Sequence, residues 1–297
     1  MEQSPSDPLS ELAQALMQRP EFESAARLYF SNLLQWRRAL GFANRLTTDP
    51  AFHVLQYVIQ LDASPATTGD GKGATYTNLL KICQDRKQCA SRALRTILGL
   101  ASFAGYLQKR PLENDQRITV YQPSAKLLTD TRRFFAQTMA CIDIIEGHGY
   151  YAEKMLTDAT FLPHVMATAG GAYIEQKLAI TEYSPDLHEL IQLRGGCPTL
   201  IAIVDAQIRR APFPTPLAIA RDFHISSSQV RNVLEAAKSN GQITTGPNGQ
   251  IENADVLAGQ FKTMLARELA MYCKYALGLE PKYCPDAAIT MRNAVSA

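Results

Sequence analysis

Two short segments carry polar side chains of the types that contact DNA bases. Arg can donate two hydrogen bonds to O6 and N7 of a guanine in the major groove, while Ser and Thr bind bases or phosphates. The spacing of these residues would place them along one side of a helix. The candidate contacts are Ser91, Arg92, Arg95 and Thr96 in the first segment and Ser228, Gln229, Arg231 and Asn232 in the second.

The second segment has the start and stop signals of a short helix. The hydroxyl of Ser226 is placed to cap the first turn, and Gly241 can adopt the positive φ that ends a helix. Residues 215–225 predict a shorter helix just upstream. The residues expected to face the core are Val230, Val233, Leu234 and Ala237 in the longer helix and Leu217, Ile219, Ala220 and Phe223 in the shorter one.

An internal repeat relates the two segments. A shift of 136 positions places Gly241 on Gly105 and Arg231 on Arg95 without a gap. Each copy continues into short strand-like segments, with Asn248-Gly249 as a tight turn in the second. We therefore predict two helix-turn-helix modules, each followed by a hairpin wing. The matching apolar pairs are Val230 with Leu94, Val233 with Ile97, Leu234 with Leu98, Ala237 with Ala101 and Ile243 with Leu107.

The hairpin segment of the first copy has a distinctive order of residues. A glycine and an aromatic residue end the helix, a basic strand follows, and an Asp-x-Arg precedes an apolar strand. These positions are Gly105, Tyr106, Lys109, Arg110, Asp115, Arg117, Ile118 and Val120. The order resembles the wing of the MarR-type bacterial transcription regulators, with "PSAKLL" in place of the usual Thr and Gly. The second copy resembles winged-helix regulators in general, because it lacks the Asp-x-Arg.

The resemblance implies how the first module would contact DNA. Arg117 would enter the minor groove or bind a phosphate, and Lys109 and Arg110 would lie along the backbone. An internal ion pair with Asp115 is the alternative for Arg117, and a solvated helix face is the alternative for the helix arginines. Gln88 is a further candidate for a side chain that faces outward toward DNA. MarR-type proteins carry one such module per chain, so this chain with two could replace the usual pair.

Charge is distributed unevenly along the chain. Residues 75–135 contain eleven Lys or Arg and four Asp or Glu, whereas residues 205–252 contain five and four. The segment 136–204 between them contains three Lys or Arg and eight Asp or Glu. Because phosphate contacts supply most non-specific DNA affinity, we expect the first module to dominate DNA binding. The second module would either contact DNA or serve dimerisation or protein contact.

The chain is predicted to be mainly α, with small β-hairpin wings and tandem winged helix-turn-helix modules joined by long helices. Residues 1–50 form an N-terminal helical region and a candidate dimerisation element. The other expected divisions are a first winged-helix domain (51–135), a helical connector (136–194), a second winged-helix domain (195–255) and a C-terminal helix (256–297).

The sequence gives little support for a phosphate-binding loop, a metal site or a catalytic site. Residues 67–75 are glycine-rich but lack the spacing of a phosphate-binding loop. Glu146, His148 and His164 lack the spacing of metal ligands, and we expect no metal, no cofactor, no catalytic residues and no enzyme activity. The scattered cysteines favour reduced thiols in a cytoplasmic protein, and Cys83 with Cys89 could form a thiol switch beside the first helix.

The predicted function is sequence-specific binding of double-stranded DNA in transcription control. The expected partners are DNA, a second copy of the chain paired through its apolar terminal helices, and a small-molecule effector in a cleft between helices. No membrane association is expected, since no apolar run reaches the length of a bilayer span. The alternatives are a plasmid or replication initiator, a protein-interaction scaffold and a thiol-responsive regulator.

Overall fold

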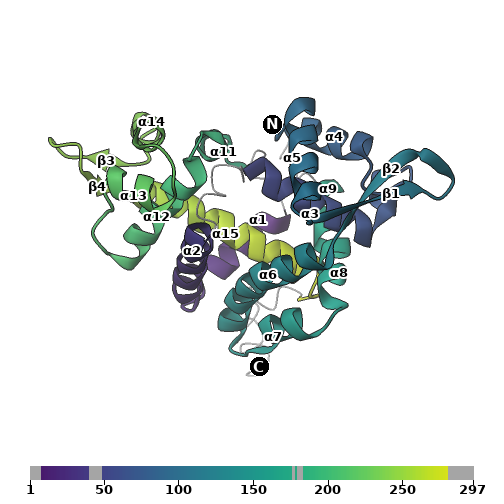
Figure 1. The fold of residues 1–297 in the computed structure, drawn as a ribbon. Coiled ribbons are helices and arrows are strands. Elements are labelled where there is room, and N and C mark those ends of the chain that lie inside the picture. The colour runs from purple at the N-terminus through teal and green to yellow at the C-terminus, as the bar shows by residue number, and fades with distance from the viewer. Residues whose placement is uncertain (1–7, 40–48, 176–177, 179–182, 280–297) are drawn as a thin grey trace, which may run out of the picture.

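The computed structural model describes residues 8–39, 49–175, 178 and 183–279. Two groups of short helices, each ending in a small hairpin, lie on opposite sides of a set of longer central helices (Figure 1). Residues 1–7 and 40–48 of the predicted N-terminal helical region, and residues 280–297 of the predicted C-terminal helix, lie outside the described residues.

The first group follows the central helix α2 (Phe22–Ala39) in the chain. In it, α3 packs on β2, and β1 and β2 form an antiparallel pair. Thr75, just before α4, makes an isolated bridge to Val120 and so adds a third short segment beside the hairpin. The elements are α3 (Asp49–Ala63), η2 (Pro65–Thr68), α4 (Tyr76–Asp85), α5 (Ser91–Phe103), β1 (Leu107–Leu112) and β2 (Asp115–Pro123).

The second group has the same order of elements but a shorter hairpin. α12 packs on both α13 and α14, and β3 pairs with β4 in an antiparallel sheet. The elements are α12 (Gly196–Arg209), α13 (Pro216–Asp222), α14 (Ser227–Ser239), β3 (Thr244–Thr245) and β4 (Ile251–Asn253).

The central helices join the two groups through one continuous core. α1 packs along α15, and α2 contacts both α6 and α12. α6 runs without interruption through residues 135 and 136, where a domain boundary was expected. The elements are α1 (Pro8–Met17), α2 (Phe22–Ala39), α6 (Ala125–Glu146), α7 (Tyr150–Thr157), α8 (Phe161–Val165), η3 (Met166–Gly170), α9 (Gly171–Glu175), α11 (Pro185–Gln192) and α15 (Asp255–Tyr275).

The prediction of a mainly helical chain with two small hairpins is confirmed. The repeat is also visible in the backbone, since α5 and α14 each contain 13 residues. Both end in the same way: Gly105 and Gly241 have φ of 75° and 70°. The next residue in each copy then donates its N–H to a helix carbonyl, Tyr106 to Ala101 and Gln242 to Ala237, both at 2.9 Å.

The predicted core faces of the repeated helices are largely correct, with one exception. The four apolar residues of α14 are buried, as are Leu94 and Leu98 of α5. Leu217 was expected inside but is 71% exposed. α13 turns by about 100° per residue, so the arc that buries Ile219, Ala220 and Phe223 leaves Leu217 facing solvent.

The apolar faces of the terminal helices are buried within the chain itself. Leu9 and Leu16 of α1, and Leu265 and Leu269 of α15, are at most 1% exposed. α1 and α15 pack against each other. These faces were expected to pair two copies of the chain, and that argument for a homodimer is wrong because they already have intramolecular partners.

Leu98→Ala should lower the free energy of unfolding by about 2–5 kcal/mol, because it opens a cavity in the core beneath α5. Leu98 is 1% exposed, whereas Leu100 on the same helix is 48% exposed. Leu100→Ala is the matched control, with an expected change within roughly 0.5 kcal/mol. Urea denaturation of both variants measures the difference; equal losses would mean that α5 does not pack through Leu98.

Candidate nucleic-acid interface

The outer face of α5 presents the base-contact candidates of the first module. Arg92, Arg95 and Thr96 are exposed, and Ser91 is half-buried. Tyr76, the first residue of α4, ties two of them together: Arg95 Nε donates to its hydroxyl at 3.2 Å, and Ser91 Oγ lies 2.8 Å from the same oxygen. The hydrogen bond with Ser91 is the main cause of a lowered pKa for Tyr76. The hydrogen bond to Tyr76 therefore holds the Arg95 side chain in place on the outer face of α5.

The starts of α5 and α14 differ in a way that matters for phosphate binding. Ala90 precedes α5 and provides no side-chain cap, so the amides of the first turn keep their capacity to bind an anion. At α14, Ser226 Oγ accepts from Gln229 N at 3.1 Å, and Gln229 Oε1 accepts from Ser226 N at 2.9 Å. Ser226 thus caps the helix as predicted. The Gln229 side chain oxygen accepts a hydrogen bond from the backbone of Ser226, so it is already occupied within the protein.

The first hairpin carries exposed basic residues on both strands. Lys109 and Arg110 are exposed on β1, and Arg117 is exposed near the start of β2. The carboxylate of Asp115 accepts from the backbone N–H of Arg117 at 3.0 Å. Within the described part of the chain these two side chains form no ion pair, so Asp115 shapes the turn while the Arg117 guanidinium extends from it.

The turn between α4 and α5 is fixed to the core by two buried polar side chains. Gln88 was an outward candidate but is 7% exposed, because its Oε1 accepts from the Tyr57 hydroxyl of α3 at 2.6 Å. Arg86 is 3% exposed and donates from Nη2 to the carbonyls of Tyr173 and Ile174 in α9. Its guanidinium also lies 4.8 Å from the centre of the Tyr173 ring. The position of α5 therefore depends on α3 and α9.

Cys83 and Cys89 lie together at the same turn. Their thiols share a hydrogen bond, which is the main reason that the pKa of Cys83 is raised and that of Cys89 is lowered. Cys83 is buried and Cys89 is half-buried. Cys89 is therefore the more reactive thiol of the pair.

The corresponding face of the second module is polar, with Arg231 as its charged candidate contact. Ser228, Arg231 and Asn232 are exposed on α14. Ser228 Oγ lies 2.9 Å from Ser226 Oγ, and Arg231 Nε donates to the Ser227 carbonyl at 3.3 Å. Residues 239–253, which include the hairpin, contain no Lys or Arg. This module offers hydrogen-bonding groups with little attraction for phosphates.

The end of α5 exposes apolar side chains that the sequence analysis did not single out. Phe103 is 94% exposed and Leu100 is 48% exposed. Both lie off the buried stripe of Leu94, Leu98 and Ala101, and that departure from the helical pattern was the signal that could have revealed them. They extend the outer face of α5 beyond Thr96 with an apolar surface.

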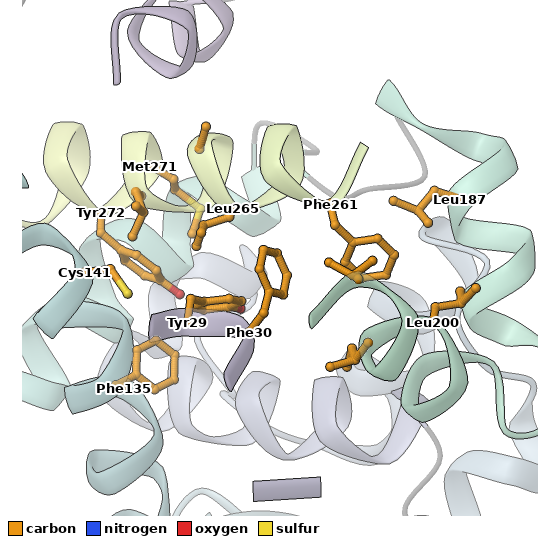
Figure 2. Close-up of a cluster of buried hydrophobic side chains, with 14 of the residues drawn as sticks. Tyr29, Phe30, Phe135, Cys141, Leu187, Leu200, Phe261, Leu265, Met271 and Tyr272 are labelled. Carbon is orange, nitrogen blue, oxygen red and sulfur yellow. The ribbon is translucent and has the colours of Figure 1, made fainter. Parts of the chain in front are cut away.

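A mainly apolar cavity of about 210 Å³ lies within the central helices. Tyr29, Phe135 and Tyr272 are among its lining residues. They lie together below α15 in Figure 2. Glu268 accepts from the hydroxyls of Tyr29 at 2.9 Å and of Tyr272 at 3.5 Å. Burial raises the pKa of Glu268 to about 7, although both hydrogen bonds act in the opposite direction. The cavity therefore combines aromatic walls with one carboxyl group.

Neither the described residues nor comparisons with known proteins assign a metal site, a membrane span or a family to this chain. Among the described residues, no group of three His, Cys, Asp or Glu side chains is arranged to hold a metal ion, and no helix has the length and apolar content of a membrane span. No protein-family model, curated protein or solved structure matches the chain.

The raised pKa of Glu268 predicts a pH-dependent cost to folding. In the unfolded chain this carboxyl ionises near its ordinary pKa of 4.5, whereas in the folded protein it keeps its proton up to about pH 7. The folded state therefore binds the extra proton between these values, and stability is lost as the pH rises through 7. Relative to Glu268→Gln, the wild type should lose roughly 2–3 kcal/mol of unfolding free energy between pH 5 and pH 8.

Urea denaturation at a series of pH values tests this difference. Glu235→Gln removes an exposed carboxylate from α14 and is the matched control, with an expected difference that stays constant. An offset between wild type and Glu268→Gln that does not change with pH would contradict the assignment.

Proposed function

We propose that this chain is a sequence-specific double-stranded DNA-binding transcription regulator that inserts α5 into the major groove. The observation that carries the proposal is the exposed face of Arg92, Arg95 and Thr96 on α5. The first-turn amides of this helix have no side-chain cap, and a basic hairpin follows it. Arg95 is held by Tyr76, which limits the side-chain freedom lost on binding a base.

The order of elements supports a winged helix-turn-helix in each half of the chain. α3, α4 and α5 lead into β1 and β2, and α12, α13 and α14 lead into β3 and β4. The bridge from Thr75 to Val120 adds the short strand that pairs with a wing at its base. With α5 in the groove, Lys109 and Arg110 would lie along the backbone and Arg117 would reach a phosphate or the minor groove.

The two modules would contribute unequally to binding. Residues 75–135 hold eleven Lys or Arg against four acidic residues, so the first module supplies the attraction for phosphates. Ser228, Arg231 and Asn232 of the second module would then contact bases weakly or serve a protein partner. A regulator of this kind acts in the cytoplasm, without catalytic activity, and pairs with a second copy only through surfaces other than α1 and α15.

A protein-interaction scaffold is the second candidate function. The observation that favours it is the apolar end of α5, where Phe103 is 94% exposed. Aromatic side chains are enriched at protein interfaces. In that case the basic residues of the first module would be incidental, and any DNA binding would lack sequence preference. A replication or plasmid initiator shares the DNA contacts and differs in binding repeated sites.

Selection from a random duplex pool at two salt concentrations tests the proposal. The wild type should enrich one motif, and Arg92→Ala/Arg95→Ala should bind it about 10–100-fold more weakly, because two base or phosphate contacts are lost. The slope of log affinity against log salt should become shallower by about 1–2. Lys154→Ala/Lys274→Ala removes the same charge from α7 and α15 and should retain the motif.

Weak binding without a motif, equal in the wild type and in Arg92→Ala/Arg95→Ala, would refute DNA recognition by α5. The scaffold would then be the better account of the exposed α5 face.

A further inference from the structure

We infer that Arg95 recognises one guanine of the bound duplex through its two terminal nitrogens, that Tyr76 of α4 positions it for this contact, and that Arg92 binds a backbone phosphate. The inference rests on the proposed function and deepens it. It names the base that α5 recognises and a residue outside α5 that sets the preference for that base.

The Arg95 side chain is held at its Nε, and its terminal nitrogens remain available. Nε donates to the Tyr76 hydroxyl at 3.2 Å, and the guanidinium carbon lies 5.4 Å from the centre of the Tyr76 ring. Nη1 and Nη2 have no hydrogen bond or ion pair among the described residues. Two parallel donors match O6 and N7 of guanine, since no other base presents two acceptors in the major groove.

The Tyr76 hydroxyl is itself fixed by the start of α5. It lies 2.8 Å from Ser91 Oγ and 3.3 Å from the Ser91 carbonyl oxygen. Tyr76 is the first residue of α4, and Thr75 caps that helix by accepting from Asn78 N at 3.2 Å. The phenol therefore connects the two helices and restricts the conformations of Arg95. Because ordering a long side chain costs free energy on binding, a positioned Arg95 binds its base at a lower entropic cost.

The other polar side chains on this face have different surroundings. Thr96 Oγ1 donates to the carbonyl of Arg92 at 3.1 Å, and Ser91 Oγ is paired with Tyr76. The Arg92 guanidinium is exposed, and within the part of the chain that the structure describes it has no hydrogen bond or ion pair. An unanchored guanidinium suits a phosphate, because that contact depends on charge more than on a fixed direction.

Gly99 leaves the surface beside Arg95 open. It follows Arg95 by four residues and therefore lies on the same face, one turn later. Gly99 is exposed, and a Cβ at this position would meet no atom within 4 Å. Glycine inside a helix lowers stability relative to alanine, and no contact among the described residues requires it here. A close approach of the duplex to this turn of α5 explains the glycine.

Replacing single guanines with 7-deazaguanine, which lacks the N7 acceptor, tests the contact of Arg95. The motif is first selected with the wild type, and each of its guanines is then replaced in turn. At one position the wild type should lose about 3–30-fold in affinity, because one hydrogen bond from a charged donor is removed. Arg95→Ala should bind that duplex and the unmodified duplex equally, whereas Arg92→Ala should still discriminate between them.

Tyr76→Phe keeps the ring and removes only the hydroxyl. It should reduce discrimination at this guanine about 3–10-fold, and the slope of log affinity against log salt should not change because no charge is lost. A merely structural role of Tyr76 would weaken binding to all duplexes equally. Tyr150→Phe removes an exposed hydroxyl from α7 and is the matched control, with discrimination unchanged.

Two further variants separate the phosphate contact and the open surface. Arg92→Ala should weaken binding to all duplexes alike and make the salt slope shallower by about 1. Gly99→Gln should weaken DNA binding about tenfold or more without lowering the free energy of unfolding, because glutamine is the better helix former.

A motif in which Arg95→Ala abolishes discrimination at no guanine would overturn the inference. Unchanged discrimination in Tyr76→Phe would overturn the role of Tyr76. Both outcomes leave DNA binding by α5 intact, whereas failure of the wild type to enrich any motif refutes the proposed function itself.

Discussion

The structure of the first module depends on the buried guanidinium of Arg86. A charge that is 3% exposed needs protein groups in place of water. Two backbone carbonyls accept from its Nη2 and the Tyr173 ring lies against the guanidinium, while its buried Nη1 has no hydrogen-bond partner among the described residues. Those groups lie on α9, far along the chain, so the turn that precedes α5 can form in this position only when the central helices are folded. The outer face of α5, the hairpin that follows it and the aromatic cavity are therefore parts of one connected arrangement.

The two modules show how one backbone pattern can carry two different surfaces. α5 and α14 have the same length and the same hydrogen bonds at their ends, yet their first turns differ. Ser226 and Gln229 close the start of α14, whereas the start of α5 has no side-chain cap. The basic hairpin beside α5 also has no counterpart beside α14. Phosphate attraction and uncapped first-turn amides coincide in the first module, and we therefore propose that DNA contacts this module.

Local features of the fold could be predicted from the sequence, and long-range ones could not. Ser226, Gly105 and Gly241 act through neighbouring residues, so their capping and turn roles followed from residue type and position. The repeat extended this reasoning from one module to the other. Gln88 and Leu217 were misplaced because their environments depend on partners or on helix rotation set by tertiary packing. The cavity and the covered face of α1 depend on contacts across most of the chain, such as Tyr29 with Glu268, and no local pattern reports them.

Lysine acetylation of the full chain, with and without the duplex enriched from a random pool, tests the central claim most directly. Lys109 lies on the basic hairpin beside α5, Lys238 lies in the last turn of α14, and Lys154 on α7 serves as the reference. If the first module binds DNA, the duplex should slow acetylation of Lys109 and leave Lys238 and Lys154 unchanged. Protection of Lys238 with no change at Lys109, measured on the saturated complex, would contradict the assignment of DNA recognition to the first module.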